Sequence, residues 1–169
     1  MYPFIAVDHR SCTGCKTCEL VCSLYHFGEC DPGRSAIRVI RREKKGLIFC
    51  LPLVCQRCEE AACIEACPTG ALMRREDGGG LIIDEDNCTA CGICAEACPA
   101  GCLSLDAARK AVIGCDLCDG EPQCVLFCHA RCLREAESSG EDGKQRVACL
   151  VEILEQEGLP GGLPGRRVQ

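Results

Sequence analysis

The stretch from Cys88 to Pro99 reads CTACGICAEACP, which spaces four cysteines as C-x2-C-x2-C-x3-C directly before a proline. Three closely spaced cysteines on a tight loop present their sulfurs to three corners of one iron–sulfur cube. Gly92 gives the backbone the freedom to curl close to the sulfides. The fourth cysteine begins a helical turn toward a neighbouring cluster, and the proline ends that turn. The spacing therefore predicts a [4Fe–4S] ligand set.

Variants of this pattern occur four times in the 169 residues. The first run has the same spacing but carries Ser23 in place of the proline, and the second and fourth runs lengthen the middle gap to four and five residues. Together the runs predict four [4Fe–4S] clusters held by sixteen cysteines. The runs are Cys12, Cys15, Cys18 and Cys22; Cys55, Cys58, Cys63 and Cys67; Cys88, Cys91, Cys94 and Cys98; and Cys115, Cys118, Cys124 and Cys128.

The second and third runs predict a pseudo-symmetric inner pair, because a short hairpin or strand follows each of them. Residues 69–73 and 81–84, with the glycine turn 77–80 between them, predict a hairpin, and residues 102–105 predict a strand in the corresponding place. In such a pair, the last cysteine of each run ligates the cluster of the other run. The expected ligands are Cys55, Cys58, Cys63 and Cys98 for cluster 2, and Cys88, Cys91, Cys94 and Cys67 for cluster 3.

The first and fourth runs flank this pair, and the same exchange applied to them predicts an outer pair. The fold class is then α+β: a nested arrangement of bacterial-type 2×[4Fe–4S] ferredoxin-like units, with short hairpins and helices and little regular secondary structure. The four-cluster domain would cover residues 1–134, with the inner pair at 50–105 and the outer pair formed by 1–30 and 110–134. The expected outer ligands are Cys12, Cys15, Cys18 and Cys128 for cluster 1, and Cys115, Cys118, Cys124 and Cys22 for cluster 4.

The composition favours metal binding over disulfide bonds. The chain has 21 cysteines, which is an odd number. It has no Trp and only 4% aromatic residues, so its apolar core needs additional stabilisation by disulfides or metals. The first cysteine is residue 12, which leaves no room for a signal peptide, so we expect a reducing, cytoplasmic location. The net charge of −6 argues against nucleic-acid or anionic-membrane partners. The longest apolar stretch, 47–55, is too short to span a bilayer.

The remaining segments predict a hairpin, a linker, a helix and a tail. Residues 36–40 and 47–51 predict a second hairpin with many Lys and Arg residues, which is either a solvated edge or a docking surface for an acidic redox partner. Residues 135–144 are expected to be a polar linker, 145–157 an amphipathic helix, and 158–169 a flexible tail.

No residue pattern indicates nucleophilic catalysis, a flavin or nucleotide site, or a P-loop, so we expect no catalytic site. Of the cysteines outside the runs, Cys102 and Cys149 fit apolar patterns and are expected in the core, while Cys30 and Cys132 are expected to be spare thiols; Cys50 has no assigned role. His129 is either structural or a hydrogen-bond donor that raises the potential of a cluster.

Over about residues 4–134, the four runs resemble the small iron–sulfur subunits of the dimethyl-sulfoxide-reductase and hydrogenase/formate-dehydrogenase type. Residues 26–29 and 31–38 are similar to the branch that accompanies tungsten enzymes of the aldehyde:ferredoxin oxidoreductase type, including class II benzoyl-CoA reductase. Residues 115–124 fit the last motif of the family. The family usually has Pro-Thr-Gly-Ala after its final cysteine, where this chain has His129 to Cys132. That departure bears on the electronic character of one outer cluster.

The resemblance implies a non-catalytic subunit that relays electrons through four clusters. Its partners would be a large tungsten- or molybdenum-pterin subunit at one end, and ferredoxin or a flavin/NAD module at the other. Clusters exposed at both ends would also allow a higher-order oligomer by head-to-tail association. The alternatives are a free-standing polyferredoxin, which co-purification distinguishes, and a structural zinc protein, which would be colourless.

Overall fold

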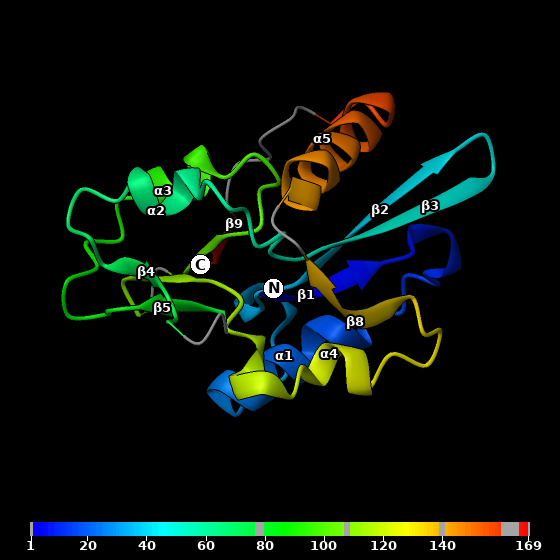
Figure 1. Ribbon diagram of the computed structural model, residues 1–169. Helices are drawn as coiled ribbons and strands as arrows, with labels where there is room; N and C mark the ends of the chain where they lie inside the picture. The colour runs from blue at the N-terminus through cyan, green and yellow to red at the C-terminus, as the bar shows by residue number, and fades with distance from the viewer. Residues whose placement is uncertain (1, 77–79, 107–108, 139–140, 160–165, 169) are drawn as a thin grey trace.

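The computed structural model describes residues 2–76, 80–106, 109–138, 141–159 and 166–168, in short helices and strands arranged in small sheets (Figure 1). This mixture agrees with the predicted α+β class. The helices and strands are β1 (Tyr2–Val7), α1 (Thr17–Phe27), β2 (Arg38–Lys44), β3 (Leu47–Leu53), α2 (Ala62–Glu65), β4 (Leu72–Arg74), β5 (Leu81–Ile83), α3 (Ile93–Ala97), β6 (Ser104–Asp106), β7 (Ala111–Ile113), α4 (Gln123–Leu126), β8 (Leu133–Ser138), α5 (Glu141–Gln156) and β9 (Arg166–Val168), with 3-10 turns η1 (His9–Ser11), η2 (Pro32–Arg34) and η3 (Leu117–Gly120).

The two ends of the cysteine-rich region form one lobe. Strand β1 pairs antiparallel with β8, from Tyr2 opposite Ser138 to Val7 opposite Leu133. Beneath this ribbon, α1 packs against α4 (Figure 1). Ile5 and Leu133 are buried in a core that also contains many of the cysteines of runs one and four. Segments more than a hundred residues apart in the sequence are therefore joined in one unit.

The pairing of β8 corrects the predicted linker at 135–144. Residues 135–138 belong to β8, and α5 begins at Glu141; residues 139 and 140 lie outside the described residues. The segment is polar because an exposed two-stranded ribbon needs few apolar side chains. Its partner strand lies at the other end of the chain, so the local pattern alone did not indicate a strand.

The second and third runs form a second lobe, in which α2 packs against α3. The predicted hairpin after run two is β4–β5, although residues 77–79 of its turn lie outside the described residues. The strand predicted at 102–105 is found at Ser104–Asp106 and forms its own hairpin with β7, which was not predicted. Each run of the inner pair is thus followed by an antiparallel hairpin, as pseudo-symmetry requires.

The two lobes meet where β5 approaches run four. The backbone N–H of Leu81 donates to the carbonyl of Cys115 at 2.9 Å. At the neighbouring Gly80, a Cβ would collide with the backbone of Asp116, so only glycine fits there. This contact fixes the start of run four against the inner lobe.

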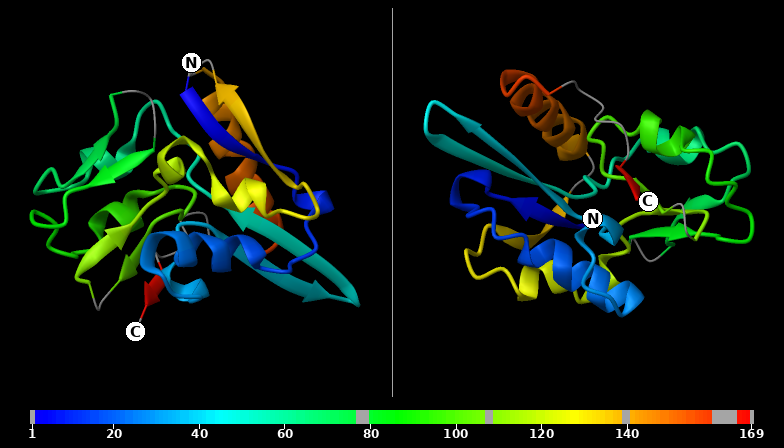
Figure 2. Two further views of the ribbon diagram at one scale, coloured as in Figure 1. Left: turned by 90° about the horizontal axis from the view of Figure 1, so that it is seen from below. Right: turned by 180° about the vertical axis from the view of Figure 1, so that it is seen from behind.

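The β2–β3 hairpin projects from the body, as Figure 2 shows. Its turn is Lys45-Gly46, both residues in the left-handed region, as a two-residue hairpin turn requires. At its base, the N–H of Val39 donates to the buried carboxylate of Glu19 in α1 at 2.6 Å. At its tip, Leu47 is 77% exposed and Ile48 is 56% exposed.

Helix α5 is amphipathic, as predicted for 145–157, and its buried residues Leu150 and Leu154 pack into the core of the inner lobe. Two parts of the tail predicted at 158–169 are described: Leu159 is buried, and β9 pairs parallel with β6. Residues 160–165 and 169 lie outside the described residues. Among the described helices, none has the length and apolar character needed to cross a membrane.

Candidate metal centres

All four cysteine runs share one backbone feature. The residue directly before the second cysteine takes a left-handed conformation in every run: φ is +70° at Gly14, +55° at Arg57, +53° at Ala90 and +63° at Leu117. Left-handed backbone is uncommon for residues other than glycine and costs roughly 1 kcal/mol or more each. Its recurrence at one motif position indicates that each run forms the same kind of curled loop.

The predicted ligands of cluster 2 lie together. Cys55, Cys58, Cys63 and Cys98 line a single cavity. Burial raises the pKa of Cys63 to about 12, and the thiolate charges of the other three contribute to that shift. In contrast, hydrogen bonds from the Cys102 side chain and several backbone groups lower the pKa of Cys98 to about 6. The lowered pKa therefore favours the thiolate form of Cys98.

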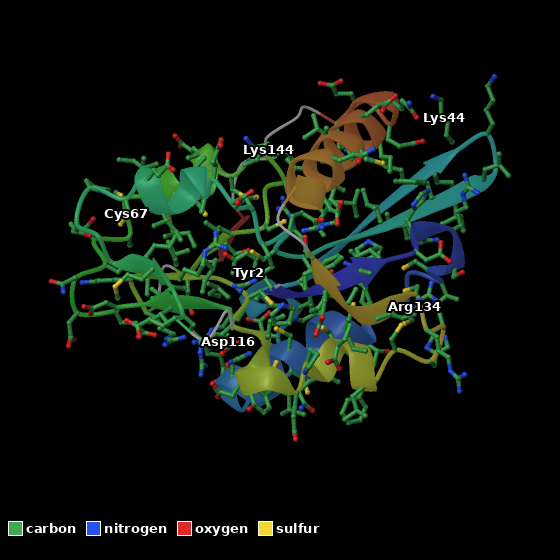
Figure 3. All side chains as sticks on the ribbon, viewed as in Figure 1. Tyr2, Lys44, Cys67, Asp116, Arg134 and Lys144 are labelled. Atoms are coloured by element: carbon green, nitrogen blue, oxygen red, sulfur yellow. The ribbon has the colours of Figure 1, made fainter. Side chains whose placement is uncertain are left out.

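The predicted ligands of cluster 3 are also brought together. Burial raises the pKa of Cys94 to about 11, and the charges of Cys67, Cys88 and Cys91 add to the shift. Cys67 comes from run two and the others from run three, so the exchanged position reaches the neighbouring run. Figure 3 labels Cys67 beside the inner helices, on the side of the molecule away from the β2–β3 hairpin.

The predicted ligands of cluster 4 line another cavity, in the outer lobe. Cys22 of run one stands there with Cys115, Cys118 and Cys124 of run four. Ile5, Ile37 and Val54 form its apolar wall. Burial is the main cause that raises the pKa of Cys115 and Cys124 above the ordinary value.

The predicted ligands of cluster 1 are the least completely assembled set. Burial raises the pKa of Cys18 to about 12, with contributions from the charges of Glu19, Cys12 and Cys15. The Sγ atom of Cys128 lies 3.5 Å from that of Cys132, which in turn hydrogen-bonds to Cys12. Cys128 is therefore linked to Cys12 of this set through Cys132.

None of the 21 cysteines, all of which lie in the described residues, forms a disulfide. Cys102 is buried in the inner core, as predicted, and its backbone N–H donates to Cys98 Sγ at 3.3 Å. Cys149 is exposed, so its predicted core position is wrong: the buried stripe of α5 passes through Leu150 and Leu154 instead. Cys30 is exposed and Cys50 is buried.

Some thiols of neighbouring sets are close enough for their charges to interact. The charge of Cys18 raises the pKa of Cys124, so the predicted ligands of clusters 1 and 4 lie near one another. The charge of Cys55 raises the pKa of Cys115, so the predicted ligands of clusters 4 and 2 also lie near one another. Within the sixteen predicted ligands, only Cys15 and Cys91 are exposed.

Two histidines contact cysteines of the outer sets. His26 Nε2 lies 3.6 Å from Cys118 Sγ, and His129 Nδ1 lies 3.8 Å from Cys15 Sγ. Hydrogen bonds to Cys118 and Cys22 raise the pKa of His26 to about 10. A role for His26 was not expected from the sequence, although its position four residues after Cys22, on the same helical face, was the available signal.

The donor set suits iron–sulfur clusters better than a single hard cation. The sets consist of thiolates, which are soft ligands, and the cavities around two of them have apolar walls. His26, Asp116 and Cys118 also place possible ligand atoms within 4.8 Å of one another. That group shares Cys118 with the fourth set, so it belongs to the surroundings of cluster 4.

Comparison with known proteins agrees with this donor chemistry. Residues 46–138 match the 4Fe-4S dicluster domain model, and residues 10–25 match a 4Fe-4S binding domain model. The polyferredoxin-like subunit of aliphatic sulfonate oxidoreductase from Pyrococcus furiosus is 38% identical over 126 residues, covering 75% of this chain and 71% of the relative. One chain of the anaerobic dimethyl sulfoxide reductase of Escherichia coli K12 is 35% identical over 145 residues, covering 75% and 69%.

Among solved structures, the active-site complex BamBC of benzoyl coenzyme A reductase with benzoyl-CoA is similar to this chain. The identity is 27%, the TM-score is 0.46, and the match covers 92% of this chain and 96% of that chain.

Proposed function

Because this chain belongs to the 4Fe-4S dicluster family of iron–sulfur electron-transfer subunits of oxidoreductase complexes, we propose that it binds four [4Fe–4S] clusters and relays electrons between two partners. The proposed partners are a tungsten- or molybdenum-pterin catalytic subunit and an electron carrier, either ferredoxin or a flavin/NAD module. The chain itself would have no catalytic site.

The observation that carries this proposal is the recurrence of one curled loop in all four runs. Each loop has the same left-handed residue before its second cysteine, whether that residue is Gly14, Arg57, Ala90 or Leu117. The exchanged fourth cysteines add support, because Cys98 and Cys22 each line the cavity of a run other than their own. The proposed ligands are the sixteen cysteines assigned from the sequence to clusters 1 to 4.

The neighbouring thiols support a relay order of 1–4–2–3. The charge of Cys18 raises the pKa of Cys124, and the charge of Cys55 raises the pKa of Cys115. In the inner pair, the charge of Cys67 from run two raises the pKa of Cys94 in run three. The exposed cysteines belong to the proposed clusters 1 and 3, which stand at the two ends of that order. Electrons would therefore enter or leave at Cys15 and at Cys91.

When bound, each cluster supplies a site that takes up and releases one electron. The chain's residues hold and tune these sites. Apolar side chains such as Leu103 and Val54 line the cavities of clusters 2 and 4 and exclude water. Arg57 and Arg74 act electrostatically on Cys55 and Cys58 and offset part of the negative charge of the ligands.

The pterin partner is proposed from the family and from a local resemblance. Residues 26–29 and 31–38 are similar to the branch that accompanies tungsten enzymes, and the relatives include a sulfonate oxidoreductase subunit and a dimethyl sulfoxide reductase chain. We assign the carrier to the cluster 1 end. There the β2–β3 hairpin presents Arg42, Lys44 and Lys45 beside exposed Leu47 and Ile48. An acidic carrier such as ferredoxin complements this surface in charge.

Anaerobic iron and sulfide analysis tests the proposal. Four clusters require about sixteen iron atoms per chain and EPR signals of reduced [4Fe–4S] clusters. Fewer than three clusters in anaerobically prepared protein, or colourless protein that contains zinc, would contradict it. Anaerobic co-purification then identifies the catalytic subunit, and its absence would favour a free-standing polyferredoxin.

A further inference from the structure

The two outer runs each place a histidine against the other run. His26 is carried by α1, one turn after Cys22 of run one, and contacts Cys118 of run four. His129 directly follows Cys128 of run four and contacts Cys15 of run one. In both cases the contacted residue is the second cysteine of its run. The contacts are therefore exchanged across the outer lobe in the same way as the proposed ligands.

The surroundings of His26 require a hydrogen on Nε2. Its Nε2 atom faces Cys118 Sγ at 3.6 Å and Asp116 Oδ1 at 3.4 Å. A carboxylate and an iron-bound thiolate only accept hydrogen bonds, so Nε2 must be the donor. Asp116 is itself held in place, because its Oδ1 accepts the backbone N–H of Cys118 at 2.9 Å.

His129 has a comparable arrangement with the opposite ring nitrogen. Nδ1 faces Cys15 Sγ at 3.8 Å, and Nε2 faces Thr13 Oγ1 at 3.5 Å. An iron-bound Cys15 thiolate requires the hydrogen on Nδ1, and the hydroxyl of Thr13 can then donate to Nε2. The ring is thus oriented by a residue of the same loop that holds Cys15.

We propose that His26 and His129 are positioning residues that donate N–H···S hydrogen bonds to ligands of clusters 4 and 1 and raise the reduction potentials of these clusters. The inference rests on the proposed four-cluster function. A donor at a ligand sulfur stabilises negative charge, which is larger after the cluster has gained its electron. Each imidazole therefore favours the reduced state of one outer cluster.

The chain offers matched variants for each histidine. Gln at position 26 keeps an N–H near the place of Nε2, and Asn at position 129 keeps one near Nδ1, whereas Leu at either position removes the donor. The third histidine, His9, lies 5.8 Å from the Phe49 ring and has no hydrogen bond to sulfur among the described residues. His9→Leu is therefore the control for loss of an imidazole as such.

The experiment is an anaerobic redox titration followed by EPR, on protein whose iron content has been measured. His26→Leu and His129→Leu should each shift the reduction equilibrium of one cluster, a different one in each variant, about tenfold toward the oxidised state, or about 59 mV for one electron. His26→Gln, His129→Asn and His9→Leu should stay near wild type. Cys118→Ser and Cys15→Ser identify the affected signals. Where a Leu variant loads less iron, the Ala variant replaces it.

Several results would overturn the inference. Fully loaded Leu variants with unchanged potentials would exclude a tuning role, and so would Gln and Asn variants that shift as far as Leu. An equal shift in His9→Leu would show that the effect is general. The proposed function fails separately, when the wild-type protein does not contain four clusters.

Discussion

At the scale of single residues, one backbone position decides whether a cysteine run can curl around a metal site. Gly14 occupies that position in run one with φ +70°, and the Sγ atom of Cys50 lies only 2.6 Å from where a Cβ would be placed. Space requires glycine here, and the left-handed φ adds a cost for any other residue. The other runs place larger residues there, namely Arg57, Ala90 and Leu117, of which Arg57 and Leu117 are buried.

Gly14→Ala should therefore damage the loop of cluster 1. The added methyl group meets the sulfur of Cys50 as well as an unfavourable φ, so the iron content should fall from about sixteen toward about twelve atoms per chain. Gly14→Ala combined with Cys50→Ala removes the contact but keeps the conformational strain, and should recover part of the iron. Full loading of Gly14→Ala alone would contradict this account of the loop.

Two neighbouring buried cysteines provide a second prediction. Cys98 is a proposed ligand, whereas Cys102 donates its backbone N–H to Cys98 Sγ at 3.3 Å and its thiol to the carbonyl of Val54 at 3.0 Å. Cys98→Ala should lose one cluster, about four iron atoms, while Cys102→Ala should keep about sixteen. Iron analysis of the two variants, prepared side by side under anaerobic conditions, tests the assignment. Equal iron loss in both variants would be inconsistent with it.

At the scale of secondary structure, the tip of the β2–β3 hairpin is exposed at Leu47 and Ile48, and Glu157, directly after α5, lines the same hollow as its basic side chains. Arg41 of this hairpin also lies over the Gly14 loop, with its Cδ atom 4.0 Å from the position that a Cβ would take at that glycine. The hairpin thus connects the surroundings of cluster 1 to an exposed basic and apolar surface. Figure 3 shows Lys44 near this tip, far from Cys67 of the opposite lobe.

Reversing the charge at this tip should slow electron transfer with an acidic carrier. Lys44→Glu with Lys45→Glu is expected to lower the rate with reduced bacterial ferredoxin about tenfold at low salt, because steering of the encounter is lost. Stopped-flow absorbance measures this rate, and high salt should bring variant and wild type together. Lys110→Glu with Lys144→Glu, which makes the same change of charge on exposed side chains outside the hairpin, is the matched control. A similar loss in that control would exclude a specific docking role.

The elements also show what the sequence could and could not predict. The β4–β5 and β2–β3 hairpins were predicted because both strands and their glycine turns are adjacent in the chain. The β1–β8 pair was missed because its strands are separated by most of the chain, and β8 is polar. The contact between His26 and Cys118 was missed for the same reason, since it joins residues 92 positions apart.

At the scale of the whole molecule, cysteines take the place that large apolar residues hold in other cores. Both core clusters of buried residues contain several of the proposed ligands. With no Trp and 4% aromatic residues, little other apolar mass is available. Free thiols in these positions would repel one another when ionised and leave cavities when neutral, so metal binding and folding should be coupled.

Removal of the metal should therefore unfold the chain. Chelation under anaerobic conditions, or oxidative damage to the clusters, is expected to abolish the circular dichroism signal of native structure and resistance to protease. The measurement compares holo and cluster-free protein at equal concentration. A cluster-free form that keeps both properties would show that the polypeptide is stable without its metal.

The separation of the outer ligands also constrains how the protein is made. Cys12 and Cys128 stand near opposite ends of the cysteine-rich region, and β1 lacks the strand it pairs with until β8 has left the ribosome. During synthesis, the four cysteines of run one would therefore stay unligated while the inner lobe can already fold. Maturation would then proceed from the centre outward, with the terminal ribbon sealing the last two sites.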